Sequence, residues 1–116
     1  MAATIYGIKN CDTMKKARSW LEEHAVAHDF HDYKAVGIDR AHLEKWTAEA
    51  GWETVLNRAG TTFRKLPEEA RQDLDKDKAI ALMIEQPSMI KRPVVEADGK
   101  LLIGFKPDSY ADFFES

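Results

Sequence analysis

A chain of 116 residues has the usual size of one domain and is too short for two independent hydrophobic cores, so we expect a single domain over 1–116. Hydrophobic residues make up 44% and charged residues 32% of the sequence, a balance that excludes a wholly disordered chain. The 17 Lys and Arg residues against 20 Asp and Glu residues give a net charge of -3, without the broad positive charge that attracts nucleic acid or anionic membranes.

The apolar runs of the sequence are only a few residues long, far shorter than a membrane-spanning segment or the core of a signal peptide. Cys11 is the single cysteine, which excludes an intramolecular disulfide and suits a reducing compartment. We therefore expect a cytoplasmic monomer that binds neither nucleic acid nor membrane.

The first third of the chain predicts a β-α-β unit. Residues 4–8 predict a short strand, and a polar junction around Cys11 follows it. From Met14 to Ala25, apolar residues recur at spacings of three and four, which is typical of an amphipathic helix. A weak alternation over 26–33 then predicts a second strand, and the crossover between the two strands is expected to be right-handed.

The rest of the chain predicts a helical insert over about 38–86, followed by a hairpin and a last helix. Within the insert, helical segments are expected over 40–50, 52–56, 67–74 and 76–85. The apolar runs 93–97 and 100–103 flank Asp98-Gly99, the strongest short signal for a two-residue hairpin turn. The final segment 108–114 predicts a helix that packs on the sheet through Tyr110, Phe113 and Phe114.

Cys11 is the first candidate for chemistry because the junction places it at the start of the predicted helix. A thiol is a nucleophile only as the thiolate, which the N–H groups and the positive dipole end of a helix start favour. Lys15 lies one helical turn further on and adds positive charge, whereas Asp12 opposes it. From position alone, two interpretations stay open: a reactive thiolate, or a small buried hydrophobic side chain.

Three basic residues in loop positions are further candidates. Arg92 precedes Pro93 at the entrance to a predicted strand, where the X-Pro bond can be cis and the Arg92 backbone is left free to pair with a bound peptide. The alternative is a solvated arginine beside an edge-strand proline. Arg58 lies in a helix-ending turn before Gly60, and Lys106 follows the last predicted strand. Each of these two, taken alone, is an ordinary surface cation.

Other kinds of site find no support in the sequence. The four histidines lack the spacing of metal ligands, and no glycine-rich phosphate loop or serine nucleophile motif occurs, so we expect neither a metal nor a nucleotide cofactor. The apolar stripe of Trp46, Trp52, Val55 and Leu56 lacks interleaved basic residues and is therefore expected to be core rather than a nucleic-acid stacking surface.

Four segments together resemble the ArsC/Spx family, and most closely its YffB branch: 5–17, 57–58, 90–94 and 104–107. The resemblance spans essentially the whole chain. It implies an α/β fold with a thioredoxin-like, mixed four-stranded sheet, flanking helices and a helical insert. It also favours the reactive interpretation of Cys11.

The resemblance implies roles for single residues. Cys11 matches the family's nucleophile, with Asn10, Asp12 and Thr13 as its neighbours at the helix start. Arg58 and Arg92 match two of the three arginines that surround the oxyanion in arsenate-reducing members, and Pro93 matches a cis-proline. The third arginine position is Lys106, which keeps the charge but lacks the planar fork that grips an oxyanion, so arsenate turnover is disfavoured. Met14 replaces the second cysteine of the C-x-x-C pair found in the regulator branch.

The function that the resemblance implies is that of a glutathione-dependent thiol reductase. Cys11 would form a mixed disulfide with glutathione or a glutathionylated substrate, while Lys15 and the helix start stabilise the thiolate. Arg58, Arg92 and Lys106 would hold the glutathione carboxylates, and glutaredoxin is a possible partner. The alternatives are an arsenate reductase that uses glutathione and glutaredoxin, a non-enzymatic Spx-like regulator that docks on a larger protein, and a family member that has lost its activity.

Overall fold

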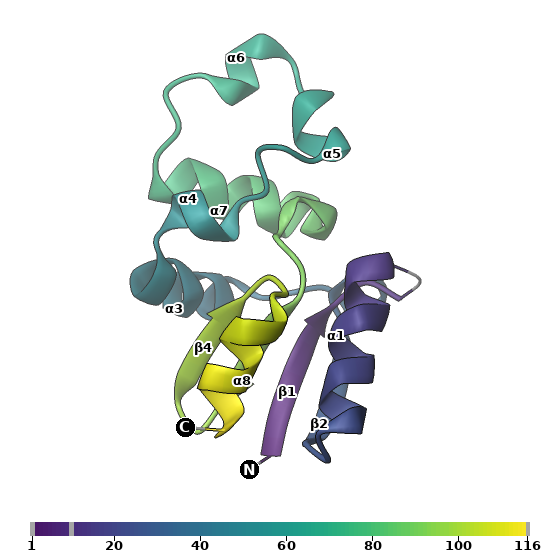
Figure 1. Cartoon of the computed structure of the whole chain (residues 1–116). Helices are drawn as coiled ribbons and strands as arrows, with labels where there is room; N and C mark the ends of the chain where they lie inside the picture. The colour runs from purple at the N-terminus through teal and green to yellow at the C-terminus, as the bar shows by residue number, and fades with distance from the viewer. Residues whose placement is uncertain (1, 10, 116) are drawn as a thin grey trace. The chain divides into compact units, whose positions relative to one another are not determined.

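The computed structural model describes residues 2–9 and 11–115, and for Ala2 and Glu115 only the backbone (Figure 1). Its elements fall into two compact units, one made of residues 1–36 and 92–116 and the other of residues 37–91. In the part of the chain that the structure covers, no helix is both long and apolar enough to cross a membrane. The single domain over 1–116 with an insert at about 38–86 stays a prediction.

The first unit contains the predicted four-stranded mixed sheet. Its strands are β1 (Ala2–Gly7), β2 (Ala27–Asp32), β3 (Val94–Ala97) and β4 (Lys100–Ile103), in the order β2-β1-β3-β4. β1 and β2 are parallel, whereas β1 with β3 and β3 with β4 are antiparallel. The predicted hairpin is confirmed, because Asp98 (φ 51°) and Gly99 (φ 74°) both adopt the positive φ of a type I′ turn between β3 and β4.

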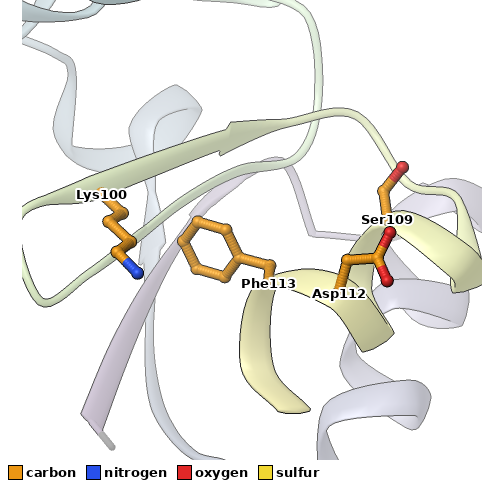
Figure 2. A pocket seen from close by; sticks show the side chains of 4 residues that line it. All are labelled: Lys100, Ser109, Asp112 and Phe113. Carbon is orange, nitrogen blue, oxygen red and sulfur yellow. The ribbon is translucent and has the colours of Figure 1, made fainter. Parts of the chain in front are cut away.

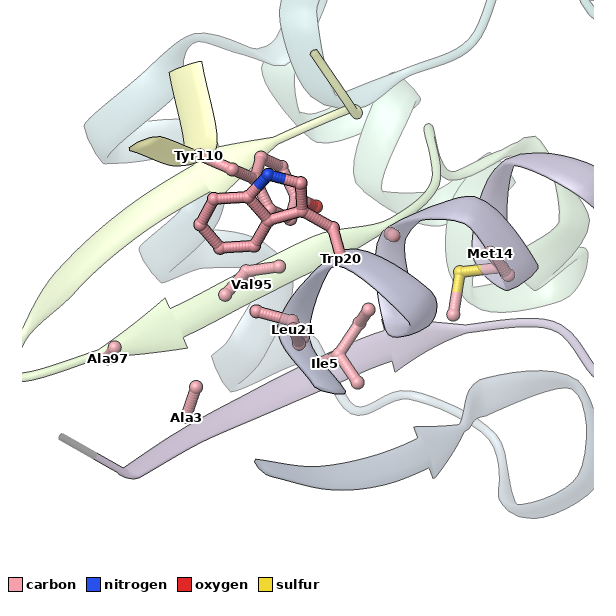
Figure 3. Close-up of a cluster of buried hydrophobic side chains, with 9 residues drawn as sticks. Ala3, Ile5, Met14, Trp20, Leu21, Val95, Ala97 and Tyr110 are labelled. Carbon is pink, nitrogen blue, oxygen red and sulfur yellow. The ribbon is translucent and has the colours of Figure 1, made fainter. Parts of the chain in front are cut away.

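Helices α1 (Asp12–Glu23) and α8 (Pro107–Glu115) cover one face of this sheet. The apolar stripe of α1 packs on Ile5 and Val95, the central residues of that face (Figure 3). Trp20 of α1 meets Tyr110 of α8 edge to face, with ring centres 5.5 Å apart. Phe113 and Phe114 pack against the same cluster, as the sequence predicted. Burial of this apolar surface is what fixes the start of α1 relative to the strands.

Helix α1 ends earlier than its apolar spacing predicts, because the chain turns at Ala25. Ala25 has a positive φ of 56° and an exposed side chain. Its N–H donates to the Glu22 carbonyl at 3.2 Å, and the N–H of Val26 donates to the Leu21 carbonyl at 2.8 Å. These two bonds form a Schellman motif, in which the left-handed position is usually glycine.

Replacing Ala25 with glycine should therefore stabilise the protein. An alanine in the left-handed region costs about 1 kcal/mol, which a glycine avoids. Part of this gain is lost again because glycine gives the unfolded chain more conformational entropy. We expect a net gain of about 0.5 kcal/mol in the free energy of unfolding, measured by urea denaturation. The same replacement at Ala48, an exposed position inside a helix, is the control and should destabilise by about 1 kcal/mol.

The second predicted strand also ends earlier than the pattern over 26–33 indicates. Tyr33 opens a short helix, α2 (Tyr33–Val36), instead of closing β2. The Asp32 carboxylate accepts the N–H groups of Lys34 and Ala35 at 3.0 and 3.2 Å. This local bonding competes with strand pairing and turns the chain at Tyr33.

The second unit is helical: α3 (Arg40–Ala50), α4 (Trp52–Val55), α5 (Thr61–Arg64), α6 (Glu68–Arg71), α7 (Lys76–Glu85) and the 3-10 turn η1 (Pro87–Met89). The bounds of α3 and α7 match the prediction because Asp39 and Asp75 cap them, each accepting a backbone N–H. The helix predicted over 67–74 shrinks to α6, since Asp73 takes a positive φ of 52°. Neither α5 nor η1 was predicted.

The core of the second unit includes the aromatic stripe that the sequence assigned to packing. Trp46, Val55 and Leu56 are buried, with exposed fractions of 0 to 2%. Trp52 is half-buried instead, and the Arg58 guanidinium lies 5.6 Å from its ring centre. Leu56 forms an antiparallel bridge with Ile90, which joins the end of α4 to the segment after η1.

Candidate functional site

Cys11 is the N-cap residue of α1, at the point where the chain leaves β1. Its backbone is extended (φ -102°, ψ 132°), and its carbonyl accepts the N–H of Lys15 at 2.9 Å, the first bond of the helix. The thiol is free and half-buried, and one side of it packs on the apolar cluster under α1. The sulfur therefore lies at the edge of the core with the open end of a helix beside it.

A close contact between β1 and α1 fixes this position. Gly7 is buried at the end of β1, and a Cβ atom placed on it would overlap Sδ of Met14. Met14 is itself buried, with 2% of its surface exposed. A glycine at this position therefore lets the first turn of α1 approach the strand end closely, which brings Cys11 up against the sheet.

The environment of Cys11 favours its ionised form. Burial alone would raise the pKa of the thiol. The backbone N–H of Met14, a hydrogen bond from the Arg92 side chain, the N–H of Thr13 and the charge of Arg92 act in the opposite direction and outweigh it. Although the sulfur makes no full capping hydrogen bond, the balance leaves the pKa of Cys11 below its usual value.

Arg92 reaches Cys11 from the segment that enters β3. The peptide bond between Arg92 and Pro93 is cis, and Pro93 is buried. The Pro93 carbonyl accepts the N–H of Gly104 at 2.8 Å, which joins this segment to the end of β4. Lys106 follows two residues later, and its side chain is exposed. The segment of Arg92 thus enters the sheet next to the point where the segment of Lys106 leaves it.

The side chains of the other predicted site residues are less closely tied to the thiol. Lys15, Asp12 and Thr13 have exposed side chains on the first turns of α1, and Asn10 lies outside the described residues. Arg58 belongs to the second unit, so its role at Cys11 stays a prediction. The structure brings together Cys11 and Arg92, with Pro93 adjoining, at the start of α1.

Tyr33 is a member of this cluster that the sequence did not indicate. Its side chain is fully buried (0% exposed) and hydrogen-bonded to the side chain of Arg92. Its hydroxyl is close enough to Cys11 for the two groups to affect each other electrostatically. Burial, the largest influence, raises the pKa of the Tyr33 hydroxyl and keeps it protonated at neutral pH. The predicted strand over 26–33 concealed Tyr33, because only the turn at Asp32 directs it inward.

Two other kinds of site, a metal centre and a surface hollow, are weaker candidates than the thiol. Among the residues that the structure describes, no three His, Cys, Asp or Glu side chains could jointly hold a metal ion. A hollow of about 410 Å³ beside α8 is lined by Lys100, Ser109, Asp112 and Phe113 (Figure 2). The strand register places Lys100 opposite Ala97, which pairs with Ala3 at the start of β1, whereas Cys11 follows the far end of that strand. The hollow therefore does not adjoin the thiol.

Known proteins resemble this chain over nearly its whole length. The ArsC family matches residues 6–113. A solved structure called the YffB protein is 71% identical, covers 95% of this chain and 96% of its own, and superposes with a TM-score of 0.92. An arsenate reductase (ArsC) related protein from Brucella melitensis is 58% identical, with a TM-score of 0.79, and covers 100% of this chain and 97% of its own.

A regulator is among the relatives as well. The global transcriptional regulator Spx of Streptococcus mutans is 28% identical over 112 residues, 95% of this chain and 81% of its own length. The resemblance to the ArsC/Spx family and its YffB branch, and the thioredoxin-like fold that it implied, are confirmed. With a cysteine at the start of its first helix and a family match over nearly its whole length, this chain belongs to the ArsC family.

Proposed function

We propose that this protein is a glutathione-dependent thiol–disulfide oxidoreductase that uses Cys11 as its nucleophile. The observation that carries the proposal is the position of the free, half-buried thiol at the start of α1, with the N–H groups of that helix and the Arg92 side chain beside it, which together lower its pKa. A half-buried, electropositive environment of this kind distinguishes reactive cysteines from structural ones. Membership of the ArsC family, with relatives named as arsenate reductase-related, supports a reductase.

The proposed reaction has two exchange steps. The Cys11 thiolate attacks one sulfur of a glutathionylated substrate, so that a Cys11–glutathione disulfide forms and the substrate leaves as a thiolate, which takes a proton from water. The thiolate of a second glutathione then attacks the glutathione sulfur of this mixed disulfide. Cys11 leaves as a thiolate and oxidised glutathione is released, so the net reaction converts the glutathionylated substrate and one reduced glutathione into the free substrate thiol and oxidised glutathione. Glutaredoxin could replace glutathione as the attacking thiol in the second step.

The proposal assigns binding roles to the cations and to the cis-proline segment. Arg92, next to the sulfur, would hold a glutathione carboxylate, and the backbone on either side of the Arg92–Pro93 bond would pair with the peptide. Lys106 is proposed to bind the remaining carboxylate charge and Lys15 to add to the field at the thiol, while the role of Arg58 stays a prediction from the sequence. Glutathione carries two carboxylates and only one ammonium group, so the net negative charge of the peptide accounts for the use of several cations.

Exposure of the protein to oxidised glutathione, followed by intact mass spectrometry, tests the proposal. We expect a single glutathione adduct, located on Cys11 by peptide mapping and removed by reduced glutathione. In Arg92→Ala the adduct should form at least about tenfold more slowly, because a charge-assisted hydrogen bond contributes about 1.5–3 kcal/mol. Arg18→Ala is the matched control: Arg18 lies on α1 with its guanidinium over the Phe30 ring, 4.7 Å from the ring centre, and its loss should leave the adduct rate unchanged.

Two results would contradict the proposal. The first is a wild-type protein that remains free of adduct while a small alkylating reagent still modifies Cys11, which would show a reactive thiol without recognition of glutathione. The second is equal adduct formation in wild type and Arg92→Ala, which would remove Arg92 from glutathione binding.

The nearest second candidate is arsenate reduction, which the name of the Brucella melitensis relative favours. It would use the same Cys11 thiolate as nucleophile toward the oxyanion. Lys106 is the discriminating residue, because a lysine lacks the bidentate fork of the family's third arginine. Arsenate reduction measured with glutathione and glutaredoxin should be weak in the wild type and rise in Lys106→Arg; strong wild-type turnover would favour this second candidate.

A non-enzymatic role as a regulator is suggested by the 28% identity with Spx of Streptococcus mutans. Such a protein would bind a larger partner and need no turnover at its thiol. Met14, at the fourth position of the motif, excludes the intramolecular C-x-x-C disulfide as a switch in this chain. A stoichiometric partner whose binding survives Cys11→Ser would favour regulation over catalysis.

A further inference from the structure

Tyr33 is a buried polar residue with no place in the proposed reaction. It lies where β2 ends, and its exposed fraction is 0% although it begins a short surface helix. Two hydrogen bonds to the Asp32 carboxylate, from the N–H groups of Lys34 and Ala35, hold the turn that directs the ring inward. Burial of a phenol is favourable only when its hydroxyl has a partner, so the partner is informative.

The Arg92 side chain is a partner of that hydroxyl. A guanidinium carries only donors, so the Tyr33 oxygen accepts the hydrogen bond from Arg92. The same guanidinium donates to Cys11. One cation thus joins the phenol of Tyr33, at the end of β2, to the sulfur of Cys11, at the start of α1, although the three residues are far apart in the chain.

This arrangement is better suited to holding the Arg92 guanidinium in one orientation than to acid–base catalysis. A flexible arginine side chain loses rotamer freedom when it is held against a thiolate. A second, buried hydrogen bond already restricts the side chain, so less freedom is lost when Arg92 contacts the sulfur. Because the buried phenol stays neutral, it accepts from Arg92 without competing for its positive charge. Arg92 therefore keeps that charge for the sulfur.

We propose that Tyr33 is a positioning residue of the thiol site, whose phenol oxygen holds the Arg92 guanidinium in the orientation that stabilises the Cys11 thiolate. The inference rests on the proposed function only in taking Cys11 as the reactive group, and it holds for any substrate of that thiol. It adds to the site a residue that touches neither substrate nor sulfur in the reaction and that acts through Arg92.

The test uses Tyr33→Phe, which removes one oxygen atom and keeps the ring. The rate of alkylation of Cys11 by iodoacetamide, a neutral reagent, is measured from pH 5 to pH 10 at full folding, checked by circular dichroism. We expect the pH profile to move to higher pH and the rate at pH 7 to fall by about two- to threefold, because a higher pKa lowers the thiolate fraction and only partly raises its nucleophilicity.

Tyr110→Phe is the matched control. Tyr110 is equally buried in the same unit, and its hydroxyl donates to the Gly104 carbonyl at 3.0 Å instead of meeting Arg92. Both variants lose one buried hydrogen bond and should lose similar stability, about 1 kcal/mol. Tyr110→Phe should keep the wild-type pH profile. A profile displaced equally in both variants, or in neither, would overturn the inference.

A double-mutant cycle separates action through Arg92 from a direct effect. In an Arg92→Gln background the further change Tyr33→Phe should leave the pH profile unmoved, since the group that it positions is absent. Additive displacements would overturn the inference. Should Tyr33→Phe not fold, wild-type protein provides the measurement: the Arg92 guanidinium N–H groups should exchange with solvent more slowly than those of exposed Arg64, and equal rates count against it.

None of these measurements uses glutathione, so they test the positioning role separately from the proposed function. A displaced profile together with absent glutathione adducts would refute the proposed function and leave the positioning role intact. An unmoved pH profile together with normal glutathione adducts would refute the positioning role of Tyr33 and leave the proposed function intact.

Discussion

Replacing Cys11 with serine should reduce glutathione exchange to the background rate, the largest loss expected of any single change in this chain. A serine hydroxyl stays protonated at neutral pH and cannot form a disulfide, so neither exchange step can occur. Initial rates of reduction of a glutathionylated peptide, with glutathione present, would measure the loss. Activity in Cys11→Ser above that of a protein-free control would eliminate the thiol mechanism.

The difference in stability between the wild type and Cys11→Ser should depend on pH. The folded pKa of Cys11 lies below its usual value, so the folded state releases the thiol proton more readily than the unfolded chain. Ionisation therefore adds stability that is fully present above the unfolded pKa and is lost as the pH falls through the folded pKa. Wild type should gain stability relative to Cys11→Ser as the pH rises through this window, which urea midpoints between pH 6 and pH 10 would show. Because the sulfur is half-exposed, solvent screening keeps the gain small.

Arg92→Gln should produce the second largest effect, and its two consequences can be measured separately. The variant loses the hydrogen bond and the charge that lower the pKa of Cys11, so alkylation by iodoacetamide at pH 7 should fall by about three- to tenfold. Exchange with oxidised glutathione should fall by about a further tenfold or more, since the variant also loses a charged contact to a carboxylate.

The shape of the alkylation profile distinguishes this explanation from a loss of structure. A thiolate with a raised pKa is more nucleophilic, so the plateau rate of Arg92→Gln at high pH should equal or exceed that of the wild type. Arg18→Gln removes the same charge from α1 and should keep the wild-type profile. A uniform fall in rate at every pH, including the plateau, would show that Arg92 acts on access or folding and not on the pKa.

Elements whose signals are local could be predicted with good bounds. Helices α3 and α7 each follow an aspartate whose side chain caps the helix, and the hairpin turn requires the positive φ that Asp98 and Gly99 accept readily. These signals act within four residues, so they are visible in the sequence. The early ends of α1 and β2 depend on hydrogen bonds at Ala25 and Asp32 that apolar periodicity does not encode.

The sequence by itself determined that a lone cysteine would stand between a strand and an amphipathic helix, because both elements are set by side-chain spacing on either side of Cys11. It could not decide the protonation of that thiol, since burial raises the pKa and helix N–H groups lower it. Only the tertiary structure settled the balance, by bringing Arg92 from the entrance of β3 to the sulfur. It also placed the buried Tyr33 behind that arginine. Contacts between residues so distant in the chain depend on sheet register and core packing, which no local pattern specifies.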